Sequence, residues 1–278
     1  MVAVKNDEDW ELYYKRNETG EEIKKTVKAR DIFDLLCRNN WDYAEPGILY
    51  WDRITNWNLV SNDKDFEYAG VNPCAEEPLP AGGSCLLGAI NLAAFVRNGK
   101  FDWHDFNRTV NIAVKALNNV LDEGLERHPL AEQRKTVRDW RQIGLGIMGL
   151  ADMLIKLGIE YGSPDSITLC DAIGYSMARN AIVASADIAG YAGCYDKYNE
   201  QYVTTSPFFA EHIKPDDEEA WSFIKNNGLR NSQLLTIAPT GSISTMIGVS
   251  GGIEPIFANY YERTTKSLHG HDEVYKVY

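Results

Sequence analysis

Apolar residues recur at helical spacing along several stretches of the chain, and this periodicity predicts its main helices. One helix begins at Asp102 and ends near Gly124, a second covers roughly residues 139–157, and a third covers roughly residues 164–190. A shorter, acidic helix is predicted over residues 217–227. In the first helix, the apolar positions are Phe106, Val110, Ala113, Val114, Leu117, Val120, Leu121 and Leu125.

Two short runs of apolar residues predict buried strands. Residues 84–96 are almost continuously apolar, and residues 233–238 form a second run of this kind. Such runs are typical of strands that are covered by other elements on both faces. Long helices combined with few, buried strands predict a helix-rich α/β fold.

The N-terminal part of the chain and some of its connections are more polar. Residues 1–30 are polar and charged, and we treat them as a segment separate from a domain that covers residues 31–278. Residues 31–60 have a helical pattern that is broken at Glu45-Pro46-Gly47, since proline and glycine interrupt helices. Residues 191–215 are predicted to form a loop.

Size and charge narrow the classes of partner. The chain has 278 residues, enough to bury a sizeable core. Its formal net charge of −12 at pH 7 argues against a nucleic-acid polymer as partner, because phosphate backbones need clustered Lys and Arg. A small phosphorylated ligand remains compatible, since backbone N–H groups at a helix start can hold it. No apolar run is long enough for a membrane helix and there is no secretion signal, so we expect a cytoplasmic protein without a membrane partner.

One segment brings a thiol together with groups that can assist its chemistry. Cys74 lies two residues after Asn72 and two residues before Glu76. If the segment is extended, these three side chains point to the same side. A second thiol, Cys85, follows after a Pro/Gly turn. An amide, a base and two thiols in one small volume suit thiol-based redox or radical chemistry.

The other cysteines point to no special chemistry. The total is five, and no two of them form a CxxC motif, so a disulfide framework is not expected in a cytosolic chain of this size. Cys37 and Cys170 fall on the apolar faces of predicted helices, where free cysteine is commonly buried as a small hydrophobe. Cys194 lies in a Tyr-rich loop and is uninformative.

The run that follows the second predicted strand is a candidate phosphate site. Its glycine lets a ligand approach the backbone, its hydroxyls can donate hydrogen bonds, and a following helix would offer unpaired N–H groups. A plain strand–helix connection with hydroxyl caps is an equally good interpretation. The residues of the run are Pro239, Thr240, Gly241, Ser242, Ile243 and Ser244.

Three further motifs are better explained by structure than by function. Gly144–Gly149 matches the glycine pattern of dinucleotide sites, but no strand is predicted before it, so we interpret it as a close-packed glycine face of a helix. His269-Gly270-His271 lacks nearby carboxylate or cysteine ligands, so no metal site is predicted. Tyr260-Tyr261 lies near Phe257, which favours packing over a redox role.

Several of these segments, in the same order along the chain, resemble the catalytic subunits of ribonucleotide reductases. Residues 72–79 (NPCAEEPL), followed by residues 84–92 (SCLLGAINL), resemble the family's active-site finger loop and the next strand. Residues 238–244 together with residues 252–255 resemble its phosphate-binding strand and loop. Two further matches are residues 143–152, a helix between these motifs, and residues 45–53, the stretch before the finger loop.

The resemblance implies a fold and a mechanism. The fold would be part of a ten-stranded α/β barrel, namely the finger loop and a portion of the second half-barrel. Cys74 would become the thiyl radical that abstracts the ribose 3′-hydrogen. Glu76 would act as base on the 3′-hydroxyl, so that the 2′-hydroxyl leaves as water. Asn72 would orient the sugar hydroxyls, Cys85 would be one of two thiols that supply electrons, and the turn at 240–244 would hold the phosphates.

The resemblance also implies partners. The short spacing from Cys74 to Cys85 is most similar to the adenosylcobalamin-dependent class, which implies that cofactor. A radical from a separate metal-containing subunit is the alternative. The substrate would be a ribonucleoside di- or triphosphate, and a thioredoxin-like protein would be the reductant.

The chain lacks parts of the family's pattern. No segment before residue 72 matches the strand that carries the partner cysteine of Cys85, and Cys37 is a poor substitute. Half a barrel exposes strand edges and apolar surface, so we expect a complementary chain or a homo-oligomer and predict no turnover by the chain alone. Two alternatives remain open: another thiol enzyme that uses Cys74 and Glu76 without nucleotides, and a non-catalytic fragment that acts as an assembly module.

Overall fold

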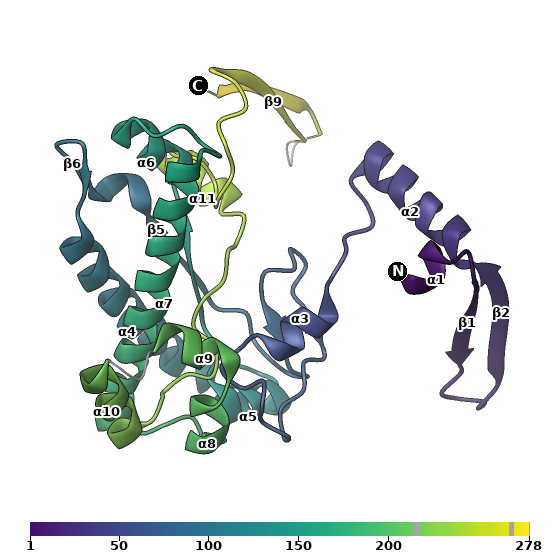
Figure 1. Cartoon of the computed structure of the whole chain (residues 1–278), viewed down its shortest axis with the longest axis horizontal. Coiled ribbons are helices and arrows are strands. Elements are labelled where there is room, and N and C mark those ends of the chain that lie inside the picture. Colours follow the sequence, from purple (N-terminus) through teal and green to yellow (C-terminus); the bar gives the residue numbers. More distant parts are fainter. Residues whose placement is uncertain (214–216, 267–269, 278) are drawn as a thin grey trace. The chain divides into compact units, whose positions relative to one another are not determined.

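The computed structural model describes residues 1–213, 217–266 and 270–277, which belong to two compact units, residues 1–51 and 52–278 (Figure 1). In the N-terminal unit, β1 (Asp9–Lys15) and β2 (Glu22–Lys28) form an antiparallel hairpin. The flanking helices are α1 (Val2–Lys5) and α2 (Ala29–Tyr43). The sequence did not predict this hairpin, because almost every side chain in it is exposed and no apolar alternation marks its strands.

A small parallel sheet forms the centre of the second unit. β5 (Leu87–Asn91) pairs in parallel with β8 (Gly144–Met148), with Leu87 opposite Gly144. Residues 233–236 form a short, irregular third strand along the other edge of β8. Leu235 forms a single parallel bridge to Leu145, and the Leu145 N–H donates to the Leu234 carbonyl over 2.8 Å, so the strand predicted over residues 233–238 is only partly present. All residues of β8 are buried, as expected for a central parallel strand. Because the strands are parallel, their carboxyl ends lie at one edge of the sheet.

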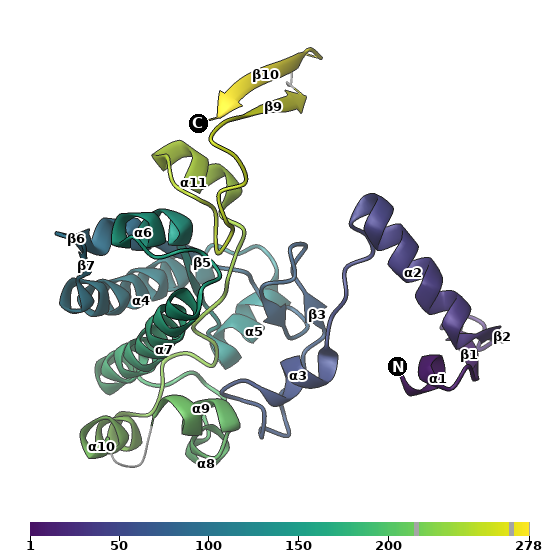
Figure 2. The ribbon, with the colours of Figure 1, turned by 45° about the horizontal axis from the view of Figure 1, so that its top comes forward.

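Two long helices pack beside this sheet and beside each other. α4 (Trp103–Leu125) and α7 (Pro164–Ala192) lie side by side, with α10 (Glu218–Asn227) against α7 (Figure 2). Asp102 caps the first of these helices by accepting a hydrogen bond from the Asp105 N–H. Ser163 caps the second, with proline at its first position. Both long helices therefore begin where the sequence predicted.

The remaining elements connect these parts. The helices are α3 (Trp51–Asn56), α5 (Ala131–Trp140), α6 (Leu150–Leu157), α8 (Glu200–Thr204), α9 (Pro207–His212), α11 (Gly241–Ile247) and the 3₁₀-helix η1 (Leu92–Phe95). The short strands are β3 (Gly70–Val71), β4 (Pro78–Leu79), β6 (Val96–Arg97), β7 (Lys100–Phe101), β9 (Tyr261–Lys266) and β10 (Asp272–Val277).

The helix predicted over residues 139–157 is wrong in its first half. Residues 139–140 are the end of α5, residues 144–148 form the central strand β8, and residues 150–157 form α6. The run is apolar at every position, so periodicity alone does not separate a buried strand from a helix. The close packing expected of the glycines is real but belongs to the strand, since a Cβ on Gly146 would lie 2.6 Å from the Thr236 carbonyl oxygen.

The loop predicted over residues 191–215 is also incomplete. It contains α8 and α9, which are capped by the side chains of Asn199 and Ser206. Both helices are too short to produce a clear apolar period. The α/β class is confirmed. Within the described residues, the parallel pair of β5 and β8 is extended by residues 233–236, the other four strand pairs are antiparallel, and no closed barrel forms.

A buried polar cluster links the helices to the segment that precedes the third strand. The side-chain amide of Asn231 exchanges hydrogen bonds with that of Asn118 on α4, over 3.0 and 3.1 Å. Asn231 also donates to the Arg141 carbonyl over 2.8 Å and accepts from the Ser185 hydroxyl on α7 over 3.1 Å. All four residues are buried, so the cluster fixes the start of the third strand against the helical layer.

Candidate active site

The thiol candidate lies at the tip of a short hairpin. β3 and β4 pair antiparallel, with Val71 opposite Pro78, and the loop between them covers residues 72–77. Asn72 closes this loop: its N–H donates to the Glu77 carbonyl over 3.2 Å, and its side-chain oxygen accepts from the Glu77 N–H over 2.9 Å. The Ala75 N–H donates to the Asn72 carbonyl over 2.9 Å and forms a turn around Cys74.

The expectation of an extended segment is therefore wrong. Residues 72–77 form a turn, and Ala75, between Cys74 and Glu76, has a φ of 67° in the left-handed region. Strand alternation does not apply across such a residue. The candidate side chains share one end of the hairpin because the loop folds back on itself.

The structure brings the predicted thiol-site residues together. The side-chain amide nitrogen of Asn72 lies 4.0 Å from the Cys85 sulfur. Cys74 and Glu76 are near enough to Cys85 to raise the pKa of its thiol. Both cysteines are exposed, whereas one carboxyl oxygen of Glu76 is buried without a hydrogen-bond partner.

Sequence reasoning missed the neighbouring carboxyl group, Glu77. Its exposed fraction is 0 %, and neither of its oxygens has a partner at hydrogen-bond geometry. Burial raises the pKa of Glu77 to about 7, the Cys85 thiol beside it lowers that pKa, and Glu76 raises it. The only available signal was a second glutamate after Glu76, and nothing in the local pattern says which of the two is buried.

The same carboxyl group acts on its thiol neighbour. Desolvation raises the pKa of the Cys85 thiol to about 12, and the neighbouring Glu77 carboxyl group raises it further. The thiolate is therefore disfavoured, and near neutral pH Cys85 is a neutral thiol.

A tyrosine links the hairpin to the third strand. The Tyr68 hydroxyl donates to the side-chain oxygen of Gln233 over 3.3 Å. Burial and the charge of Glu77 raise the pKa of Tyr68. Gln233 also accepts from the Gln142 side chain over 3.1 Å. The base of the hairpin is thus joined to the amino end of the strand that leads to the phosphate candidate.

The phosphate candidate is a turn followed by the short helix α11. Thr240 has a φ of 53° and does not cap the helix with its side chain. Its hydroxyl instead accepts from the Gly252 N–H over 2.8 Å, which joins the turn to the second half of the motif. Pro239, Gly241, Ser242 and Ile243 are exposed, and Ser244 is buried. The first turn of α11 therefore presents backbone N–H groups without a side-chain cap.

The two candidate sites lie at different ends of the sheet. Cys85 precedes β5 at the amino end, and the turn at 239–244 follows the third strand at the carboxyl end. The path from Gln233 to Pro239 along an extended strand measures roughly 20 Å. Within the described residues, no hydrogen bond joins the four thiol-site residues to the turn.

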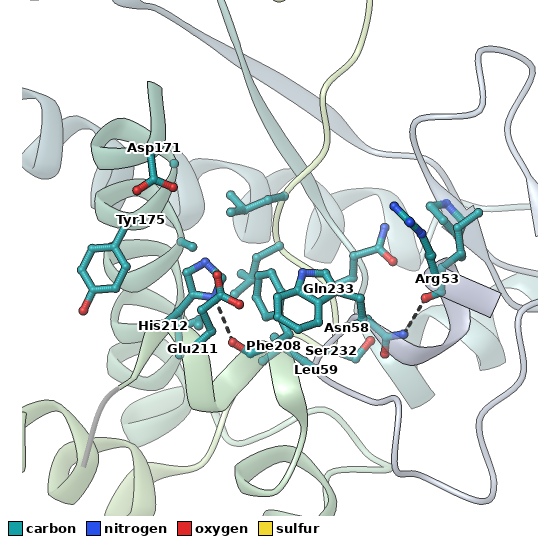
Figure 3. Close-up of a pocket in the computed structure, with 18 of the residues that line it drawn as sticks. Arg53, Asn58, Leu59, Asp171, Tyr175, Phe208, Glu211, His212, Ser232 and Gln233 are labelled. Atoms are coloured by element: carbon teal, nitrogen blue, oxygen red, sulfur yellow. Dashed lines mark hydrogen bonds between the residues drawn. The ribbon is translucent and has the colours of Figure 1, made fainter. Parts of the chain in front are cut away.

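One cavity lies beside the hairpin but is not lined by Cys74 or Cys85. It measures about 1030 Å³ and lies between α7, α9 and residues 53–59. Asp171 and Tyr175 of α7 lie on one side of it and Arg53 on the other (Figure 3). Two smaller cavities, of about 340 and 390 Å³, lie against the sheet. None of the three is lined by Cys74, Cys85, Asn72 or Glu76.

The other cysteines are held differently. Cys37 lies on α2 but is exposed, so the expected burial is wrong; in α2 only Ala29 is buried, and no core covers the cysteine. Cys170 is partly buried against the core, as expected. Cys194 is partly buried, and its sulfur lies 3.4 Å from the Asn227 carbonyl oxygen.

The remaining motifs form no site in the part of the chain that the structure describes. His271 is exposed, and His269 lies outside the described residues. No cluster of three His, Cys, Asp or Glu side chains suited to a metal ion is found among described residues. Tyr260 and Tyr261 are exposed, contrary to the packing role expected for them. None of the described helices is long and apolar enough to cross a membrane.

Comparison with known proteins places these motifs in a family. Residues 2–277 match the model of the ribonucleotide reductase barrel domain. The chain is 36% identical over 248 residues to a vitamin B12-dependent ribonucleoside-diphosphate reductase of Thermoplasma acidophilum, covering 89% of this chain and 29% of that protein. It is 32% identical to the enzyme of the same name from Mycobacterium tuberculosis H37Rv, covering 87% and 31%.

A further relative bears a different name. The ribonucleoside-diphosphate reductase subunit alpha of Chlamydia pneumoniae is 30% identical, over 93% of this chain and 26% of that protein. The chain thus spans less than a third of the length of each of these three relatives. Because the family model matches almost the whole chain, the protein belongs to the ribonucleotide reductase barrel-domain family.

Proposed function

We propose that this chain is the catalytic-core portion of a ribonucleotide reductase, which reduces ribonucleoside di- or triphosphates by thiyl-radical chemistry. The supporting observation is the hairpin that presents Cys74 at its tip and brings Glu76 and Asn72 to Cys85. The family membership and the names of the relatives support the same reaction.

Each of these side chains has a role in the proposal. Cys74, as a thiyl radical, takes the 3′-hydrogen of the ribose, and its exposure leaves it accessible to a substrate. Glu76 accepts the 3′-hydroxyl proton, which favours loss of the 2′-hydroxyl as water. Asn72 holds the loop closed and directs its amide toward Cys85. Cys85 supplies electrons together with a second thiol.

The phosphate groups of the substrate are assigned to the turn at 239–244. Its exposed backbone and uncapped N–H groups suit an anion, and the hydrogen bond from Gly252 to Thr240 holds the turn in shape. The turn lies at the carboxyl end of the sheet, whereas Cys85 lies at the amino end. For one substrate to reach both, the tip of the hairpin must point toward the carboxyl end of the sheet when substrate is bound.

Adenosylcobalamin is the radical source that we propose, because two relatives are named as vitamin B12-dependent. When bound, it would supply the oxidising radical that converts the Cys74 thiol to a thiyl radical. The exposed thiol fits attack by an external group. None of the three cavities described above is lined by Cys74, and no residue of this chain is assigned to hold the cofactor.

A complementary chain or a second copy would complete the site, and a thioredoxin-like protein would reduce the disulfide. In the described residues, β5 and residues 233–236 pair only with β8, which leaves two strand edges open. Apolar side chains near the carboxyl end of the third strand are also exposed, including Ile237, Ile253 and Phe257. Such surface needs a covering partner.

The test replaces the matching segment of the Thermoplasma acidophilum relative with this chain. Formation of deoxyribonucleotides from a ribonucleoside diphosphate is measured with adenosylcobalamin and dithiothreitol. The chimera is expected to be active and the isolated chain inactive. Cys74→Ser is expected to abolish the activity, whereas Cys37→Ser, which changes an exposed thiol in the N-terminal unit, leaves it intact. A chimera that keeps its activity after Cys74→Ser contradicts the proposal.

A further inference from the structure

The buried carboxyl group of Glu77 has no role in the chemistry proposed above. It is fully buried, and neither oxygen has a partner at hydrogen-bond geometry. A buried polar group without partners destabilises the fold, and more so when it is charged. An apolar side chain before Pro78 would fill the same space without that cost. Position 77 therefore holds a carboxyl group that packing alone does not require.

The groups that face Glu77 come from three parts of the chain. Cys85 faces it from the segment before β5, Glu76 from the hairpin loop, and Tyr68 from the segment before β3. None of these groups is a cation. The neighbour best able to exchange a proton with the carboxyl group is the Cys85 thiol, because the Tyr68 hydroxyl donates its hydrogen bond to Gln233.

We propose that Glu77 is the positioning residue for Cys85: it keeps this cysteine as a neutral thiol while reduced, and it takes up the thiol proton when Cys85 is oxidised. The backbone supports this pairing, because the hydrogen bonds between Asn72 and Glu77 fix the carboxyl-bearing residue, while the Asn72 amide contacts the Cys85 sulfur. One closed loop thus sets the position of both partners.

The oxidation part of this inference rests on the proposed function. Its electrons and protons balance between the thiols and the ribose. Two S–H bonds break and one S–S bond forms, which releases two electrons and two protons. At the ribose, one C–O bond breaks, one C–H bond forms, and the hydroxyl leaves as water. This consumes the same two electrons and two protons. Glu77, as carboxylate, receives the Cys85 proton and passes it on toward the leaving water.

The high pKa of Cys85 agrees with this inference, since Glu77 is its largest contributor after burial. A glutamate that does not face Cys85 would leave the acid–base behaviour of the thiol unchanged. The two roles are therefore separated by the pH profile of Cys85 reactivity and not by stability alone.

The experiment measures the rate at which iodoacetamide alkylates Cys85 in the full chain, from pH 6 to pH 10. Fragment-ion mass spectrometry separates the label on Cys85 from that on Cys74, and Cys37 in the N-terminal unit is the internal reference. In Glu77→Gln the profile is expected to move to lower pH, with alkylation at a fixed pH at least about tenfold faster, the factor that one pKa unit represents.

The matched control is Glu67→Gln, which removes an exposed carboxylate from the same region of the chain. Its effect is expected to stay within roughly twofold, because solvent screens an exposed charge. A folded Glu77→Gln variant with the wild-type profile overturns the inference. No nucleotide or turnover is involved, so this outcome is distinguishable from failure of the proposed reductase function.

A second measurement covers the case in which Glu77→Gln does not fold. Carbon-13 NMR of the glutamate carboxyl groups follows the titration of Glu77 in the wild-type chain and in Cys85→Ala. The carboxyl group is expected to titrate above the other glutamates, with a midpoint that rises when the thiol is removed, because the thiol stabilises the carboxylate. An identical midpoint in the two proteins overturns the inference.

Discussion

Gly146 allows two strands of the sheet to approach more closely than any side chain permits. A Cβ at this position would lie 2.6 Å from the Thr236 carbonyl oxygen, a separation that real Cβ atoms essentially never show. The obstacle is a backbone atom, which no rotamer change removes. In Gly146→Ala the third strand must move away from β8, which weakens the hydrogen bond from the Thr236 N–H to the Leu145 carbonyl, now 3.1 Å.

The expected loss of unfolding free energy is the sum of two effects, overpacking and a weakened hydrogen bond. Overpacking a tight interior costs about 1–3 kcal/mol, and weakening a buried backbone hydrogen bond adds about 1 kcal/mol. We expect Gly146→Ala to lower the free energy of unfolding of the second unit by about 2–4 kcal/mol. The assay is urea unfolding followed by circular dichroism, with the midpoints compared at a constant slope.

The matched control is Gly174→Ala in α7. No atom lies within 4 Å of an added Cβ there, and the backbone is already helical. This change is expected to stabilise the chain by about 0.5–1 kcal/mol, because glycine is a poor helix former. If Gly146→Ala unfolds at the same urea concentration as wild type, then close approach of the backbone is not what requires glycine in β8, and the reasoning is wrong.

Three other predictions concern the buried cluster, the hairpin and the turn. Asn231→Ala leaves its partners on two helices unsatisfied and is expected to cost about 3 kcal/mol in urea unfolding, against less than about 0.5 kcal/mol for the exposed Asn226→Ala. Burial raises the pKa of Glu77 from 4.5 to about 7, so the folded state binds an extra proton between these values. The free energy of unfolding therefore falls as pH rises through this window, and Glu77→Gln is expected to remove a slope worth about 3 kcal/mol. Thr240→Ala frees the Gly252 N–H and is expected to weaken calorimetric binding of a ribonucleoside diphosphate about fivefold, whereas Thr245→Ala, whose hydroxyl bonds only within α11, has little effect. Equal affinities for the last pair would remove support for a phosphate site at this turn.

The long elements were predictable from the chain because their signals are redundant. α4 and α7 combine an apolar period with a side-chain cap at a fixed position, Asp102 and Ser163, so period and boundary agree. The central strand was not predictable in this way. Its glycine at position 146 is explained by a carbonyl oxygen about ninety residues further along the chain, and only tertiary packing shows that contact.

The candidate site was predictable in its residue types but not in its geometry. The resemblance identified Cys74, Glu76, Asn72 and Cys85, and the structure brings them together through a turn that the assumed strand alternation would not produce. Glu77 was missed because burial distinguishes it from its neighbour, and burial depends on how the hairpin folds against Cys85.

The loop that carries the thiol is closed by hydrogen bonds between residues only five apart, Asn72 and Glu77. Contacts of such low order form on the timescale of a single hairpin and need no distant chain to meet them. The third strand, in contrast, reaches β8 only after the whole of α6 and α7 has been synthesised. During synthesis, the loop that carries Cys74 can therefore fold before the third strand has paired with β8.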